Sequence, residues 1–162
     1  MLNITERITN AAAVDDQLEL PFDLRQKSRL RVTLQSGQEA ALLLDRGIIL
    51  RGGDLLRAEN GLVIEIIAAE QPVQDVLAQN PHALMCAAYH LGNRHVPLQI
   101  GDDWLRLEQD HVLKEMLLGL GMTITEKYAP FEPEAGAYGG GHRHQHDDGL
   151  PIRQPARLRK HA

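Results

Sequence analysis

The sequence predicts an α+β protein of two small domains, an N-terminal all-β sandwich or barrel-like domain followed by a C-terminal ferredoxin-like βαββαβ domain. Short apolar runs separated by glycine turns fill the first seventy residues, two capped helical segments alternate with strand-like segments after Glu70, and periodicity ends near Pro130 ahead of a glycine run. We therefore expect a β domain at 1–70, a ferredoxin-like domain at 71–138 and a flexible, histidine-containing tail at 139–162.

The expected β domain consists of strands joined by tight turns. Leu30, Val32 and Leu34 alternate with polar residues, which is the period-two pattern of a half-buried strand. Asn60-Gly61 is a strong hairpin signal, because both residues tolerate the positive φ that a tight hairpin turn needs. Closely spaced strands with turns between them predict a small sandwich or barrel.

The expected second domain alternates strands and helices. Asn80 and Asp110 each precede a helical segment, where their side chains can accept hydrogen bonds from free amides of the first turn. We expect Gly92 and Gly121 to end these two helices. In chain order, the expected segments are a strand at 73–78, a helix at 82–91, strands at 97–100 and 104–107, a helix at 112–120 and a strand at 122–127.

Composition argues against several classes of protein. No apolar run reaches the ~18–20 residues of a membrane-spanning helix, and the amino end lacks a basic segment followed by an apolar core. The single cysteine, Cys86, excludes a disulfide framework and a zinc finger built on paired cysteines. Of the 17 basic and 22 acidic residues, five basic and two acidic ones follow Gly141, which leaves a net charge of −8 on residues 1–141. We therefore expect a cytoplasmic protein that binds neither nucleic acid nor membranes.

Catalytic motifs are scarce, so we expect no enzyme. The sequence has no phosphate-binding loop, no dinucleotide fingerprint and no His-Glu-x-x-His pair. Cys86 and His90 lie four residues apart and could pair as nucleophile and base, although the apolar neighbours of Cys86 favour a small core residue. Two alternatives stay open: a hydrolase, Cys-His or metal-dependent, that uses Cys86, His90 and His95, and a protein-interaction adaptor that binds metal adventitiously.

Histidine is unusually frequent, and its imidazole suits nickel, zinc and copper. The eight histidines are His82, His90, His95, His111, His142, His144, His146 and His161. His95 falls between a helix and a strand, where a ring nitrogen can face the surface, but one imidazole cannot hold a transition metal tightly. A symmetric dimer with His95 near its two-fold axis would double this ligand. His142, His144 and His146 alternate along the tail, so they could converge on one ion.

Several segments resemble the UreE family of urease accessory proteins. The sequence YHLGNRHVPLQI at 89–100 is similar to the family's signature, and the similarity continues through DHVL at 110–113 and PFEPEAGAY at 130–138. In the first half, KSR, LLL and RGGD also match family positions; they lie at 27–29, 42–44 and 51–54. The resemblance covers nearly the whole chain up to the tail.

The resemblance implies a nickel-binding metallochaperone that delivers Ni(II) for assembly of the urease active site, with Zn(II) or Cu(II) as further ions that bind in vitro. It implies a peptide-binding-like β domain and a homodimer in which His95 and its symmetry mate meet around one nickel ion. Its implied partners are the urease apoprotein and the other accessory proteins, including the accessory GTPase.

The tail and the second helix carry the remaining candidate metal ligands that the resemblance implies. His142 and His144, then His146, would complete or supplement the shared site. Many members have a long, histidine-crowded tail, whereas this chain has three closely spaced histidines and a basic end, so its capacity should be small. Some members have His-x-His before the second helix; this chain has Gln-Asp-His, which leaves His111 as the accessory candidate.

Overall fold

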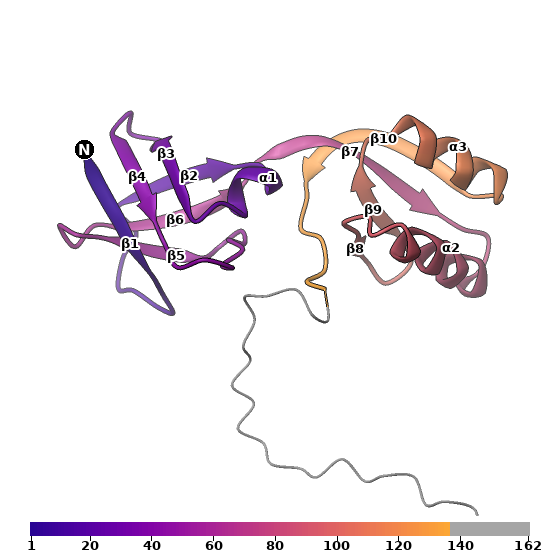
Figure 1. Ribbon diagram of the computed structural model, residues 1–162, viewed down its shortest axis with the longest axis horizontal. Coiled ribbons are helices and arrows are strands. Elements are labelled where there is room, and N and C mark those ends of the chain that lie inside the picture. Colours follow the sequence, from indigo (N-terminus) through magenta and orange to yellow (C-terminus); the bar gives the residue numbers. More distant parts are fainter. Residues whose placement is uncertain (137–162) are drawn as a thin grey trace, which may run out of the picture.

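Two β-sheets organise residues 1–136, which are the residues that the computed structural model describes (Figure 1). The first sheet has six strands in the spatial order β2-β6-β5-β1-β4-β3. β1 runs parallel to β4 and β2 parallel to β6, and the other neighbouring pairs are antiparallel. Its elements are β1 (Leu2–Ile8), β2 (Asp16–Leu20), the one-turn helix α1 (Phe22–Arg25), β3 (Arg29–Thr33), β4 (Glu39–Leu43), β5 (Leu55–Ala58) and β6 (Val63–Ala68).

The first sheet closes around a core of aliphatic side chains. Ile4, Leu42, Leu56 and Ile64 come from four different strands and are completely buried. The hairpin predicted at Asn60-Gly61 joins β5 to β6, and Gly61 has the positive φ of 87° that the turn requires. These features confirm the predicted barrel-like β fold of this half of the chain, which is mostly β and contains the short helix α1.

The second sheet has four strands in the order β10-β7-β9-β8, and every neighbouring pair is antiparallel. Its elements are β7 (Glu70–Leu77), α2 (Pro81–Asn93), β8 (Gln99–Ile100), β9 (Leu105–Glu108), α3 (His111–Gly119) and β10 (Thr123–Pro130). One core joins both helices to the sheet, with Leu91 from α2, Leu117 from α3 and Leu107 from β9 fully buried. The chain order βαββαβ and this strand order confirm the predicted ferredoxin-like fold.

Several predicted boundaries differ from the structure; β7, for example, begins at Glu70 and not at residue 73. Gly92 does not end the first helix. α2 continues to Asn93, and the chain changes direction at the next two residues. β8 is only two residues long, whereas a strand was expected at 97–100. β10 runs to Pro130 rather than ending at residue 127, because it pairs with β7 along its whole length although its side chains are mostly exposed. The expected tail at 139–162 lies outside the described residues.

The two sheets are linked in sequence by a single residue between β6 and β7, and they also touch through side chains. Phe22 of α1 packs edge-to-face on Phe131, which follows β10, with ring centroids 5.4 Å apart. The Gln71 side chain accepts a hydrogen bond from the Phe22 amide at 2.9 Å. The residues after β10 are therefore anchored to the first half of the chain.

Among residues 1–136, no helix is long and apolar enough to cross a membrane.

Candidate metal centre

His95 lies at a sharp reversal of the chain after α2. The Leu91 carbonyl accepts a hydrogen bond from the Val96 amide at 3.3 Å, and the Gly92 carbonyl accepts one from the His95 amide at 3.0 Å. This pair of bonds is the Schellman motif, in which the residue at the position of His95 adopts a left-handed conformation and is usually glycine. His95 has a φ of 56° and is the one non-glycine residue with positive φ among residues 1–136.

The turn after α2 fixes the backbone conformation of His95, and the His95 side chain lies at the surface. Leu91 is fully buried, and Val96 packs against the same core from the other side of the turn. His95 itself is exposed, as the sequence predicts for a histidine between a helix and a strand. A left-handed conformation costs a non-glycine residue roughly 1–2 kcal/mol. Strain of this kind is characteristic of functional positions, which makes His95 the first candidate ligand.

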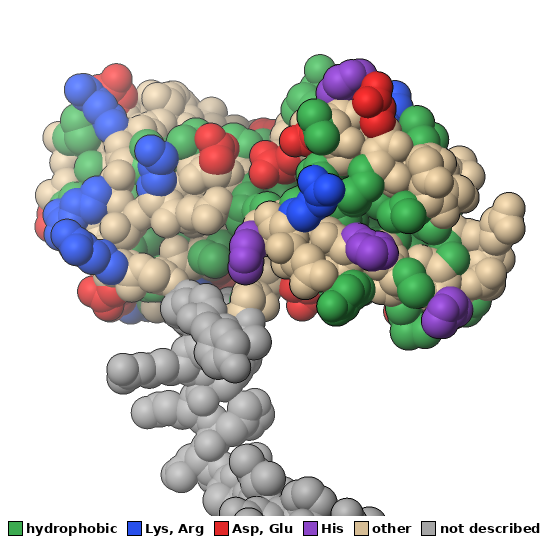
Figure 2. All heavy atoms as spheres, turned by 45° about the vertical axis from the view of Figure 1, so that its right-hand side comes forward, with side chains coloured by type: hydrophobic (Ala, Val, Ile, Leu, Met, Phe, Trp, Pro, Cys, Tyr) green, Lys and Arg blue, Asp and Glu red, His purple; other side chains and the backbone are tan. Residues whose placement is uncertain are grey.

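The histidine side chains that Figure 2 shows lie at separate places on the surface of the described part of the chain. His90 contacts the Tyr89 ring edge-to-face, with centroids 5.9 Å apart. His111 begins α3, and its Nε2 lies 3.3 Å from a carboxylate oxygen of Glu115. Within residues 1–136, no three histidine, cysteine or acidic side chains come together as a metal site. The remaining predicted ligands, His142, His144 and His146, lie outside the described residues.

Cys86 is not the small core residue that its apolar neighbours suggested. It is exposed on α2, and its Sγ lies 3.6 Å from Nε2 of His82 rather than against His90. The reason is that the buried stripe of α2 runs through Ala87 and Leu91, so Cys86 points away from the core. The nucleophile–base pair of Cys86 and His90 is therefore not formed.

The segment after β10 passes directly beside the loop that carries His95. The Glu134 amide donates to the Leu98 carbonyl at 2.8 Å, and the Glu132 amide donates to the Gln99 side chain at 2.9 Å. Leu98 is only three residues from His95. The chain therefore leaves the second sheet close to His95, a relationship that no local sequence pattern signals.

The side chain of Glu132 forms an ion pair with the buried Arg25. The Arg25 guanidinium is completely buried and donates to Glu132 and to the Phe131 carbonyl, and to the carbonyls of Leu20 and Leu50 at 3.1 and 3.0 Å. Burial lowers the pKa of Arg25, and the negative charge of Glu132 partly offsets this effect. Since its carboxylate is engaged here, Glu132 is a poor metal ligand and acts instead as an anchor for the segment that follows β10.

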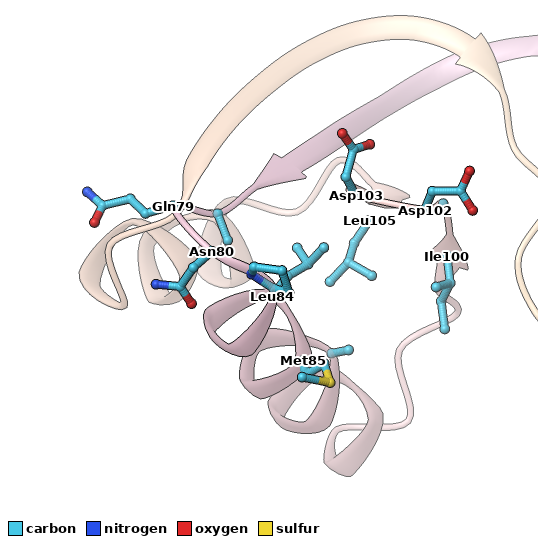
Figure 3. A pocket seen from close by; sticks show the side chains of 12 residues that line it. Gln79, Asn80, Leu84, Met85, Ile100, Asp102, Asp103 and Leu105 are labelled. Atoms are coloured by element: carbon cyan, nitrogen blue, oxygen red, sulfur yellow. The ribbon is translucent and has the colours of Figure 1, made fainter.

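An apolar hollow of about 420 Å³ lies between the amino end of α2 and the turn from β8 to β9 (Figure 3). Met85 and Ile100 line it and are 64% and 52% exposed, and Asp102 and Asp103 form an acidic edge. No histidine lines the hollow. Together with Tyr89, which is 68% exposed, it makes the surface around α2 and β8 markedly apolar.

Two family models match consecutive parts of the chain. The model described as "UreE urease accessory protein, N-terminal domain" matches residues 4–69, and the one described as "UreE urease accessory protein, C-terminal domain" matches residues 71–161. The two matches meet at the junction between the two sheets.

Curated proteins named "Urease accessory protein UreE" match over most of the chain. The protein from Cupriavidus necator is 61% identical over 131 residues, which cover 81% of this chain and 68% of the relative. The protein from Cupriavidus pinatubonensis is 59% identical over 131 residues, and this match spans only 59% of its length. The protein from Nitrosospira multiformis is 49% identical over 148 residues, covering 91% of this chain and 84% of the relative. These matches confirm the resemblance of the motifs, and the chain belongs to the UreE family of urease accessory proteins, which are chaperones and not enzymes.

Proposed function

We propose that the chain is a metallochaperone that binds Ni(II) through His95 and delivers it for assembly of the urease active site. The observation that carries the proposal is His95 itself, an exposed imidazole whose backbone is fixed in a left-handed turn. Neutral imidazole is a good ligand for nickel, and a few imidazoles at an open surface exchange a metal more readily than a closed thiolate cage.

A homodimer supplies the missing ligand in this proposal. Within residues 1–136, His95 belongs to no group of three or more histidine, cysteine or acidic side chains, and a two-fold axis near His95 would bring a second copy of the same imidazole. The exposed apolar side chains of Met85, Tyr89 and Ile100, on the two elements that flank the His95 loop, favour burial against another chain. One nickel ion would then be shared by two chains.

The tail histidines complete the nickel coordination in this proposal. Glu134 hydrogen-bonds to Leu98, so its amide nitrogen lies within about 15 Å of the Cα of His95, given 3.8 Å per residue across three residues. His142 follows eight residues later, and an extended chain spans roughly 26–29 Å over that length. His142 and His144, then His146, are thus within chain reach of His95. His111, next to Glu115, is a separate peripheral ligand.

The partners in this proposal are the urease apoprotein and the other urease accessory proteins, including the accessory GTPase. The names of the relatives support a role in urease maturation. The net charge of −8 on residues 1–141 disfavours nucleic acid as a partner.

Urease activation at limiting nickel tests the delivery function. Purified urease apoprotein with its accessory proteins would be incubated with the nickel-loaded chain, and urease activity measured. We expect His95→Ala to activate much less urease than the parent chain, and His90→Ala, which changes another exposed histidine near the same turn, to activate as well as the parent. Equal activation by His95→Ala would reject the proposal and favour an adaptor that binds metal adventitiously.

A further inference from the structure

A second pair of metal-binding side chains lies near the amino end of α2. The Sγ of Cys86 and the Nε2 of His82 are 3.6 Å apart, and both residues are exposed. They are four residues apart, so they lie one above the other on the same face of the helix. The buried stripe of α2, at Ala87 and Leu91, lies on another face, which leaves the pair accessible from solvent.

The separation of the two donor atoms matches the requirement of one tetrahedral metal ion. Tetrahedral zinc binds a thiolate sulfur at about 2.3 Å and an imidazole nitrogen at about 2.0–2.1 Å. With a tetrahedral angle between these bonds, the sulfur and the nitrogen are about 3.6 Å apart. The observed distance between Sγ of Cys86 and Nε2 of His82 agrees with this value, so the two donor atoms already have the spacing that one ion requires.

We infer that His82 and Cys86 form a second metal site, for a borderline divalent transition metal of the zinc class. The thiol releases its proton to solvent when the ion binds, and water molecules fill the other coordination positions. The thiolate favours such an ion over magnesium or calcium, which prefer oxygen ligands. Because the chain supplies only two ligands, the ion is held in an open and exchangeable site.

This site is separate from His95 and does not depend on the proposed function. His82 lies at the start of α2 and Arg94 at its carboxyl end, and with a rise of 1.5 Å per residue these twelve steps cover about 18 Å. His90 provides a matched control, because it also lies four residues from Cys86, on the carboxyl-terminal side, and makes its contact with Tyr89 instead.

Thiolate-to-metal charge transfer tests the proposal, since Cys86 is the only cysteine of the chain. The full, reduced chain would be titrated with Co(II), a spectroscopic substitute for zinc, and the near-ultraviolet absorption recorded. We expect a charge-transfer band in the parent chain, in His90→Ala and in His95→Ala, no band in Cys86→Ser, and a strongly weakened band in His82→Ala. Absence of the band from the parent chain, or an undiminished band in His82→Ala, would overturn the site.

Alkylation of Cys86 gives a second readout with Zn(II) itself. The thiolate is the reactive species towards iodoacetamide, so a bound zinc ion should slow alkylation by about tenfold or more. We expect this protection in the parent chain and in His90→Ala, and its loss in His82→Ala. His82 and His90 both lie at the helix surface, and circular dichroism verifies that each of the two variants is folded. Equal protection of His82→Ala would show that His82 is not a ligand.

Discussion

His95 after α2 and Gly121 after α3 hold the same position in two equivalent helix ends. Their φ angles are 56° and 87°. In both places two amides bond back to the last turn: Val96 to Leu91 and His95 to Gly92 after α2, and Met122 to Leu117 and Gly121 to Leu118 after α3. Glycine adopts this conformation without steric cost, whereas histidine does not. The chain therefore carries a histidine where its backbone favours glycine, as expected if the imidazole has a function.

Replacing His95 with glycine should stabilise the metal-free protein while removing the nickel ligand. We expect the free energy of unfolding to rise by about 1 kcal/mol, because the left-handed strain is relieved. Urea denaturation without metal, at one protein concentration, measures this through the fluorescence of Trp104, the only tryptophan. The matched control is Gly121→Ala, which should lower stability by about 1 kcal/mol. A less stable His95→Gly variant would contradict the strain argument.

Loss of the Arg25 side chain should strongly destabilise the contact between the two sheets. In Arg25→Met, Glu132 loses its buried partner, and the carbonyls of Leu20, Leu50 and Phe131 lose their donors. We expect a loss of about 3 kcal/mol in the free energy of unfolding. Glu132→Gln keeps a hydrogen-bond acceptor for Arg25 and should cost clearly less. Equal denaturation midpoints for Arg25→Met and the parent chain would show that the contact does not contribute to stability.

Asp75 should make stability depend on pH in the acidic range. Burial raises the pKa of Asp75, but hydrogen bonds and charges from Arg106 and Lys127 outweigh burial and hold this pKa below its ordinary value. An unfolded aspartate titrates near ~3.9, so the contribution of Asp75 is complete above that pH and is lost as the pH falls through the lower folded value. Asp75→Asn should therefore be less stable than the parent at pH 6, and the difference should shrink below about pH 4. Denaturant midpoints of both proteins at several pH values measure this; a difference that is constant with pH would contradict it.

Removal of residues 139–162 should affect metal binding and not folding. The sequence of this segment has no periodic apolar face, so its deletion should leave the denaturation midpoint unchanged. Because the chain leaves the second sheet beside Leu98, we expect fewer nickel ions per chain and a weaker, but not abolished, tightest site. Equilibrium dialysis with nickel measures both effects. An unchanged nickel content would show that the tail histidines are not ligands.

Local signals predicted the second half of the fold well. The side chains of Asn80 and Asp110 accept hydrogen bonds from Ala83 and Leu113 amides, at 2.8 and 2.9 Å, as expected of residues that begin helices. The prediction that Gly92 ends the first helix is wrong for a physical reason. Leu91 is buried and Val96 packs against the same core on the other side of the turn, and this places His95 rather than the glycine in the left-handed position.

Long-range contacts could not be predicted from local pattern. Arg25 resembles a surface residue in a one-turn helix, yet it is buried, and two of its partners, Phe131 and Glu132, lie more than a hundred residues later in the chain. The pairing of Glu134 with Leu98 depends on the same segment. The sequence pattern does not indicate β1 either, since only Ile4 of its seven residues is fully buried.

In the proposed metal centre, one nickel ion is shared by two copies of His95. Calorimetric titration of the full chain with nickel, with the molecular mass measured in parallel, tests it most directly, and His95→Ala is the matched variant. We predict a dimer whose tightest site binds about one nickel ion per two chains, and loss of that site in His95→Ala. A tightest site of one ion per chain that His95→Ala leaves unchanged would contradict the account.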